Sequence, residues 1–181
     1  MRLFYLFSIF FILVGCSSRG VEYVMPTPQM RDHGVYSSKI GVAEVKIPHY
    51  LNSDKILVQK GTELYTIDAH FATIPSKLLT QNAIVALKRS LNTADVFLYP
   101  WDFQSKKGVI VTITLDNFIY KDGYAIVAGS YYIKNTKGTM LLERNFRYKK
   151  ACNANSKDIV VTLSNLFNRV LEDVAANIAR R

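Results

Sequence analysis

The C-terminal stretch, residues 156–181, constrains the fold most strongly, because its apolar residues recur at positions i, i+3, i+4 and i+7. This spacing predicts an amphipathic helix. The apolar stripe consists of Ile159, Leu163, Leu166, Phe167, Val170, Leu171, Val174 and Ile178. Asn155 or Ser156 can cap the helix, and Asp158 suits its first turn. Such a helix needs an apolar face of another element to pack on, so the rest of the chain must supply one.

Three consecutive strand patterns can supply that face. Residues 108–120 alternate between apolar and polar side chains, and the Asp-Gly pair within 121–123 predicts a hairpin turn. A return strand over 124–133, a second turn at 135–138 and a third strand over 139–149 follow. These patterns predict an antiparallel meander.

The preceding part of the chain adds shorter elements. Residues 39–48 and 94–100 read as strands that end at prolines, 55–60 and 63–67 as a hairpin, and 75–91 as an amphipathic helix. The sum is an α/β domain in which two long helices pack on a mainly antiparallel or mixed sheet.

The N-terminus resembles a bacterial lipoprotein signal. Arg2 precedes an apolar run over 3–14 that is short for a membrane-spanning helix. Leu13-Val14-Gly15 followed by Cys16 resembles a lipobox, at which the cysteine thiol receives a diacylglyceryl group. We therefore predict lipidation of Cys16, with acyl chains such as palmitate. An ordinary secretory signal is the alternative.

This signal suggests a division of the chain and a location. We predict a signal peptide over 1–15, a lipidated cysteine and flexible tether over 16–38, and one globular domain over 39–181. By the usual sorting rule, Ser17 after the cysteine favours the outer membrane, with the domain facing the periplasm. A net charge of +9 suits anionic lipid or an acidic partner, or is simply a solvated basic surface. Outside the cytoplasm, nucleic acid is not an expected partner.

Motifs for catalysis are absent from the sequence. The three histidines are scattered without metal-ligand spacing, and Cys152 is the only cysteine besides Cys16. There is no nucleophile elbow, phosphate-binding loop or dinucleotide fingerprint. We expect a protein that is not an enzyme and that holds no metal or cofactor.

Aromatic residues are the best candidates for partner binding, since tyrosine and tryptophan combine apolar area with a polar tip. The candidates are Tyr99, Trp101 and Phe103 in one loop, and Tyr124 and Tyr132 in the meander. The alternative is that the loop residues cap the core and the strand tyrosines are half-buried sheet residues.

The order of the motifs resembles a known family. After the lipobox come VKIPHYL at 45–51, a Pro-Ser-Lys-Leu helix start at 75–78, DVFLYPWD at 95–102 and the terminal helix. This order resembles the ABC-type transport auxiliary lipoproteins, the PqiC (YmbA) family, from about Ile40 to Arg180. Residues 71–75, FATIP, lack the tryptophan and glutamate that family members often carry there.

The resemblance implies a three-layer α/β/α domain with a mixed sheet of about five strands, like anticodon-binding domains. It implies no catalytic residues. It implies an outer-membrane accessory lipoprotein that docks the periplasmic partner of an ABC or MCE-type lipid transport system, with MCE-domain or ABC transporter components as partners and a possible homo-oligomer. Two alternatives are a lipoprotein that assembles another envelope machine, such as a cell-wall synthase activator or secretion-pore pilot, and direct carriage of lipid in a cavity of the domain.

Overall fold

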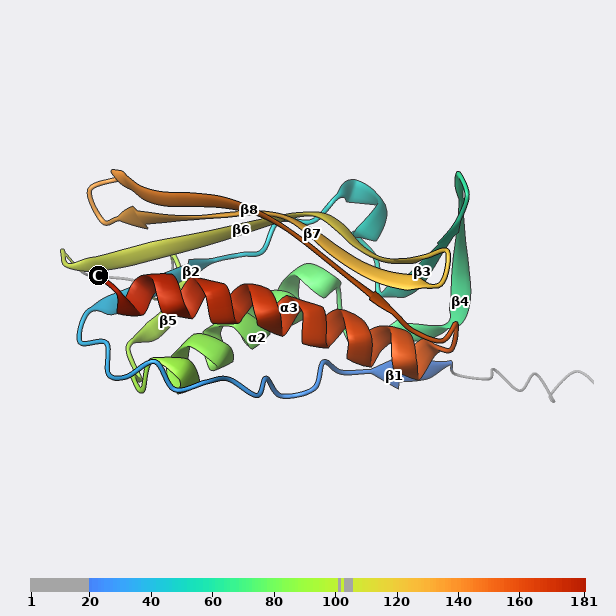
Figure 1. Ribbon diagram of the computed structural model, residues 1–181, viewed down its shortest axis with the longest axis horizontal. Helices are drawn as coiled ribbons and strands as arrows, with labels where there is room; N and C mark the ends of the chain where they lie inside the picture. Colours follow the sequence, from blue (N-terminus) through green and yellow to red (C-terminus); the bar gives the residue numbers. More distant parts are fainter. Residues whose placement is uncertain (1–19, 101, 103–105) are drawn as a thin grey trace, which may run out of the picture.

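The computed structural model describes residues 20–100, 102 and 106–181, which form one large mixed sheet and two long helices (Figure 1). The elements in chain order are β1 (Val21–Tyr23), β2 (Lys39–Ala43), the short 3₁₀ helix η2 (His49–Leu51), β3 (Lys55–Lys60), β4 (Glu63–Phe71), α2 (Pro75–Ser90), β5 (Val96–Tyr99), β6 (Gly108–Lys121), β7 (Tyr124–Asn135), β8 (Met140–Ala151) and α3 (Ser156–Ala179). Within the described residues, no helix is long and apolar enough to cross a membrane.

Strand β6 is the centre of the sheet. One of its edges pairs antiparallel with β7, which pairs antiparallel with β8, so the predicted meander is confirmed. Its other edge is divided between two parallel neighbours. The N-terminal half of β6 pairs with β2, which also pairs with β5, and the C-terminal end pairs with β3, which leads to β4 and β1. The mixed character of the sheet follows from this divided edge.

In the middle of the meander the backbones of β6 and β7 approach each other so closely that only a glycine fits. The β6–β7 register shifts between Leu115 and Asn117, so that β6 carries one extra residue there. Opposite this bulge lies Gly129, where an added Cβ would lie 2.0 Å from the carbonyl oxygen of Thr114. Any side chain at Gly129 would therefore push β6 and β7 apart.

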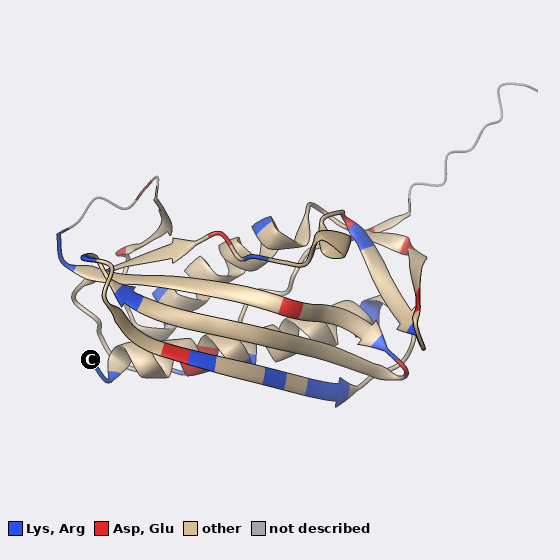
Figure 2. Cartoon of the chain, turned by 90° about the horizontal axis from the view of Figure 1, so that it is seen from above, with Lys and Arg blue, Asp and Glu red and all other residues tan. Residues whose placement is uncertain are grey.

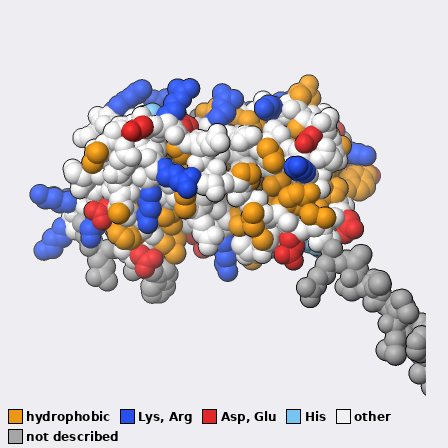
Figure 3. All heavy atoms as spheres, turned by 90° about the horizontal axis from the view of Figure 1, so that it is seen from below, with side chains coloured by type: hydrophobic (Ala, Val, Ile, Leu, Met, Phe, Trp, Pro, Cys, Tyr) orange, Lys and Arg blue, Asp and Glu red, His pale blue; other side chains and the backbone are white. Residues whose placement is uncertain are grey.

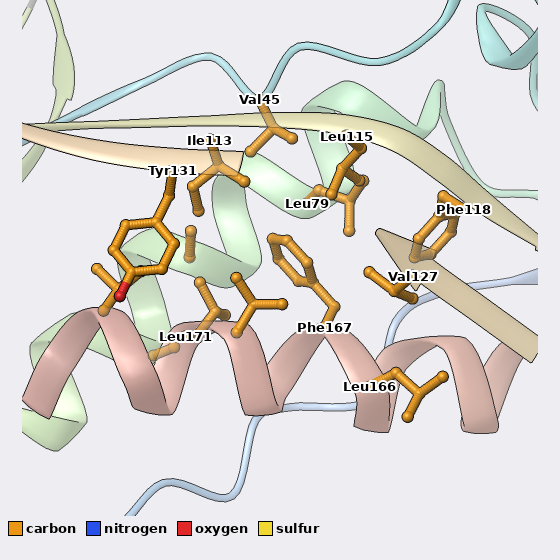
Figure 4. Packing of buried hydrophobic residues seen from close by; sticks show 14 of the residues in the cluster. Val45, Leu79, Ile113, Leu115, Phe118, Val127, Tyr131, Leu166, Phe167 and Leu171 are labelled. Atoms are coloured by element: carbon orange, nitrogen blue, oxygen red, sulfur yellow. The ribbon is translucent and has the colours of Figure 1, made fainter. Parts of the chain in front are cut away.

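The apolar stripe of α3 forms the core against the meander. Figure 4 shows Phe167 and Leu171 pointing from α3 toward Ile113 and Leu115 of β6. All four are at most 2 % exposed, and each such side chain contributes about 1.5–3 kcal/mol relative to an exposed one. Helix α3 begins as expected, because the Asn155 side chain accepts a 2.9 Å hydrogen bond from a backbone amide in the first turn.

The three-layer arrangement expected from the family resemblance is wrong. Helices α2 and α3 lie side by side on the same face of the sheet (Figure 1), where Asn82 donates to the Asn168 side chain at 3.4 Å. Buried residues from both halves of the sheet face this one helix layer. The expectation of about five strands is also wrong, since the described residues form eight. The mixed α/β class itself is confirmed.

The expected tether is wrong for the part of it that the structure describes. Residues 21–23 form β1, which pairs parallel with β4, and the Tyr23 hydroxyl lies 2.9 Å from the Ser156 hydroxyl. The chain then crosses the two helices on their side that faces away from the sheet (Figure 1). There the His33 amide donates to the Ser90 carbonyl at 2.7 Å. Residues 20–38, which we call the N-terminal segment, therefore belong to the folded domain.

Candidate interaction surface

The sheet face opposite α2 and α3 is a candidate interaction surface, because neither long helix covers it (Figure 1). Because side chains alternate along a strand, the residues between the buried ones point to this face. We call it the outer face. Its residues on the meander are Ile110, Thr112, Thr114, Ile119, Tyr124, Ile126, Ala128, Ser130, Tyr132, Glu143, Asn145, Arg147 and Lys149. Four of these side chains are buried, namely Thr112, Ile119, Ile126 and Ala128, so the exposed part of the face lies toward β8 and at the strand ends. Figure 2 views the sheet from this side, with α2 and α3 behind it, and Tyr50 of the short helix η2 reaches this side to donate to the Asp116 carbonyl of β6.

The structure brings two of the predicted tyrosines onto this face. Tyr132 lies opposite Thr112 in the β6–β7 pair, and Tyr99 lies opposite Ala43 in the β2–β5 pair. Val111 and Val42, which come just before Thr112 and Ala43, pair with each other and are buried on the helix side. Thr112 and Ala43 therefore point to the other face, and so do the tyrosines that lie opposite them. Three strand spacings separate them, about 14 Å.

The third predicted tyrosine lies far from these two. Tyr124 begins β7, eight positions before Tyr132, which is about 27 Å along the strand. It is 39 % exposed, and the Lys149 Nζ lies 3.6 Å from its ring centroid. The Lys134 Nζ lies 4.9 Å from the Tyr132 ring in the same way. Each of these two outer tyrosines therefore carries a cation over its ring.

Trp101 and Phe103 lie outside the residues that the structure describes, as does Cys16. Their predicted roles in partner binding and lipidation stay predictions. Tyr99, which precedes this loop, is 36 % exposed at the end of β5.

The outer face is basic along its free edge. Strand β8 pairs only with β7 among the described strands, and its outer side presents Arg147 and Lys149 against Glu143. Figure 2 shows that Lys and Arg residues gather toward the end of β8. An exposed strand edge with cationic neighbours suits an extended or acidic surface of a partner.

A groove on the helix side is a second concave surface. It has a volume of about 590 Å³ and lies between the N-terminal segment and α3. It is lined by Gln29, Met30, Arg31, His33, Tyr148, Arg169, Glu172, Asp173 and Ala176. Its charged groups are used internally, since Glu172 lies 3.1 Å from His33 and the Arg169 guanidinium 4.5 Å from the Tyr148 ring. These contacts hold the N-terminal segment against α3, and so charged a lining is poorly suited to bind an acyl chain.

The pKa values of one buried and one half-buried group are raised, which favours their protonated forms. Burial, together with the neighbouring Asp173 carboxylate, strongly raises the pKa of Tyr131, whose hydroxyl donates to Asp173 at 2.7 Å. Burial likewise raises the pKa of the free Cys152 thiol. A thiol with a raised pKa is a poor nucleophile. Across the part of the chain that the structure describes, no three His, Cys, Asp or Glu side chains are grouped to hold a metal ion.

The contacts of the N-terminal segment are absent from the sequence-based predictions. Glu172 accepts a 2.6 Å hydrogen bond from the Arg31 amide and also contacts His33. The only local signals were the short alternation VEYV at 21–24 and the prolines that follow, which keep a chain extended. Neither signal says against what the segment packs.

Comparison with known proteins places the chain in a family. The family model described as ABC-type transport auxiliary lipoprotein component matches residues 23–175, so the match begins within the N-terminal segment. No curated protein matches the chain.

Solved structures share the fold at low sequence identity. A crystal structure of an uncharacterized protein has a TM-score of 0.72 at 15% identity, covering 89% of this chain and 99% of its own. Protein XCC0632 from Xanthomonas campestris has a TM-score of 0.71 at 15% identity, covering 88% and 95%. A PelC dodecamer from Paraburkholderia phytofirmans has a TM-score of 0.51 at 13% identity, covering 87% and 96%. At such identities the likeness concerns the fold alone.

Proposed function

The chain belongs to the family of ABC-type transport auxiliary lipoprotein components, and from this premise we propose that it is a non-catalytic docking subunit of an envelope lipid transport system. The family match over residues 23–175 is the observation that carries the proposal. The transporter is of the ABC or MCE type, and the chain holds its periplasmic part at the outer membrane.

The proposed anchor is Cys16, carrying acyl chains such as palmitate. One acyl chain gives only marginal membrane binding, whereas two or more hold a protein stably. Ser17 in place of aspartate supports retention at the outer membrane, with the domain facing the periplasm.

The outer face is the proposed docking surface. Its support is geometric: neither long helix covers it, and Tyr99 and Tyr132 lie on it about 14 Å apart. Basic residues on β8 favour a partner surface that is acidic, because complementary charge accelerates encounter and fixes orientation. The partner is an MCE-domain protein or another ABC transporter component. The PelC structure with a similar fold is a dodecamer, which supports a homo-oligomer as the docking unit.

In-cell photo-crosslinking tests the function and the surface together. A photoreactive residue replaces Tyr99 or Tyr132, and the matched control replaces Val161, which is 38 % exposed on the helix side. The proposal expects an MCE-domain protein or an ABC permease to be captured from the two tyrosine positions and not from Val161. Equal capture from Val161 would contradict the docking surface. Capture of a cell-wall synthase or a secretin would instead contradict the function.

A further inference from the structure

The folded domain begins very close to the predicted lipid anchor. Gly20, the first described residue, lies beside Asp68 and His70 of β4, next to the start of β1. Four residue steps separate it from Cys16. Even fully extended, four steps span only about 14 Å. If Cys16 is lipidated, the end of the domain that carries β1 therefore cannot stand far from the membrane surface.

That end carries exposed apolar side chains. Val21 is 59 % exposed and Val24 is 68 % exposed. Val24 also lines a groove of about 240 Å³ between the N-terminal segment and α2. The groove is lined by Val24, Met25, Thr27, Pro28, Leu78, Gln81, Asn82 and Val85. We call Val21, Val24, Met25, Leu78 and Val85 the anchor-side patch. Figure 3 shows hydrophobic side chains gathered on the helix side, at the end of the molecule that carries β1.

The helix beside this patch adds a positive charge. Lys77, Gln81 and Val85 recur every four residues along α2 and are all exposed, so they form one stripe on its surface. A lysine next to exposed valines and leucines matches the headgroup layer of a bilayer, where phosphates lie next to the first methylene groups. Water is a poorer surrounding for these valines, because each exposed Å² of apolar surface costs about 25 cal/mol.

We propose that the anchor-side patch rests in the phospholipid headgroup layer and holds the domain in one orientation on the membrane. This inference depends on the lipid anchor of the proposed function. The acyl chains supply the affinity, and the patch fixes which side of the domain faces the bilayer. The outer face is then left free toward the periplasm, since it lies on the opposite side of the sheet from α2 (Figure 1).

Fluorescence quenching by brominated lipid tests the orientation. The full-length lipidated protein carries Cys152→Ser, and a single cysteine for an environment-sensitive fluorophore is introduced by Val21→Cys or Val24→Cys. The control is Met140→Cys, an apolar position that is 45 % exposed at the start of β8. Each protein is placed in vesicles of phosphatidylethanolamine and phosphatidylglycerol, with and without bromine on the acyl chains. We expect quenching at least threefold stronger at positions 21 and 24 than at position 140.

Two measurements test the anchor-side patch and the lipid anchor independently of each other. Vesicle flotation reports the anchor, and quenching reports the patch. Flotation with equal quenching at all three positions would overturn the proposal and leave the anchor intact. Labels at 21 and 24 that are shielded from water but insensitive to bromine would overturn it in favour of a protein contact. A protein that does not float would overturn the anchor, and the proposal with it.

Discussion

The Nε2 atom of His33 lies 3.1 Å from Oε2 of Glu172, and this contact joins the N-terminal segment to helix α3 across almost the whole length of the chain. The other carboxylate oxygen of Glu172 accepts a hydrogen bond from the Arg31 amide at 2.6 Å. Both side chains of the pair are only about one quarter exposed, at 24 % and 25 %. Glu172 therefore fixes two points of a segment that otherwise has few backbone partners.

Replacement of Glu172 by alanine should loosen the N-terminal segment without unfolding the sheet. The loss of two hydrogen bonds should lower the free energy of unfolding by about 1–2 kcal/mol. Hydrogen exchange of the His33 amide, which donates to Ser90, should accelerate at least tenfold. Glu143→Ala on the outer face is the control and should leave this amide unchanged. Unaltered exchange in Glu172→Ala would show that the apolar contacts alone hold the segment.

Tyr131 should make the domain sensitive to alkali. Its pKa lies above the ordinary value of 10.0, because burial and the Asp173 carboxylate disfavour the phenolate. As the pH rises past 10, the unfolded chain releases this proton while the folded domain keeps it, so the stabilising contribution is present below pH 10 and is lost above it. Urea unfolding from pH 8 to pH 11 should therefore show a steeper loss of stability in the wild type than in Tyr131→Phe. Parallel pH profiles would contradict this account, and Tyr124→Phe serves as the exposed control.

Gly129→Ala should be one of the most damaging small substitutions in the sheet. The added Cβ would lie 2.0 Å from the Thr114 carbonyl oxygen, and that oxygen belongs to the backbone and cannot rotate away. We expect a loss of about 3 kcal/mol in the free energy of unfolding, as for an overpacked core. Denaturant titration measures it, with the neighbouring Ser130→Ala as the control. A loss below about 1 kcal/mol would mean that β6 shifts to accept the methyl group.

The start of α3 offers a smaller and more local test. The Asn155 side chain accepts from the Asp158 amide at 2.9 Å, so Asn155→Ala should cost about 1 kcal/mol. Asn155→Asp keeps an acceptor at the same place and should restore most of the loss. Thermal unfolding followed by circular dichroism compares the two. Equal midpoints for Ala and Asp would mean that the cap adds nothing beyond the packing of α3.

The parts of the fold that depend on local pattern were predictable. The period of the apolar stripe in α3 and the alternation in β6 are properties of single segments, and the structure confirms both elements. The Asp-Gly turn was equally local, and the structure places Asp122 and Gly123 between β6 and β7 with positive φ angles.

The layer arrangement depends on pairing between distant segments, which local pattern does not encode. Both β2 and β3 pair with β6, although α2 lies between them and β6 in the chain. The pattern of an amphipathic helix predicts that it covers a face of the sheet, but not which of the two faces. The placement of α2 beside α3 could therefore not be predicted from the sequence.

The sequence predicted which residue types would bind a partner, but not how these residues are arranged on the surface. Because side chains alternate along a strand, neighbouring tyrosines of β7 point to opposite faces. Tyr131 is buried against α3 while its neighbour Tyr132 lies on the outer face. The proximity of Tyr99 and Tyr132 rests on the register of β5, β2, β6 and β7, which becomes known only when the pairing is known.

The divided edge of β6 also determines when, during synthesis, the strands can join into one cooperative folding unit. Before Gly108 is synthesised, the strands can form only two small groups, β1 with β4 and β3, and β2 with β5, and these groups share no strand. Both groups lack β6, on which they meet, and a two-stranded group such as β2 with β5 is only marginally stable in water. The arrival of β6 joins them in a single step, and the last strands and α3 then complete one unit. A C-terminally shortened chain should therefore yield no stable fragment, and newly made protein stays open to proteases until its final helix is available.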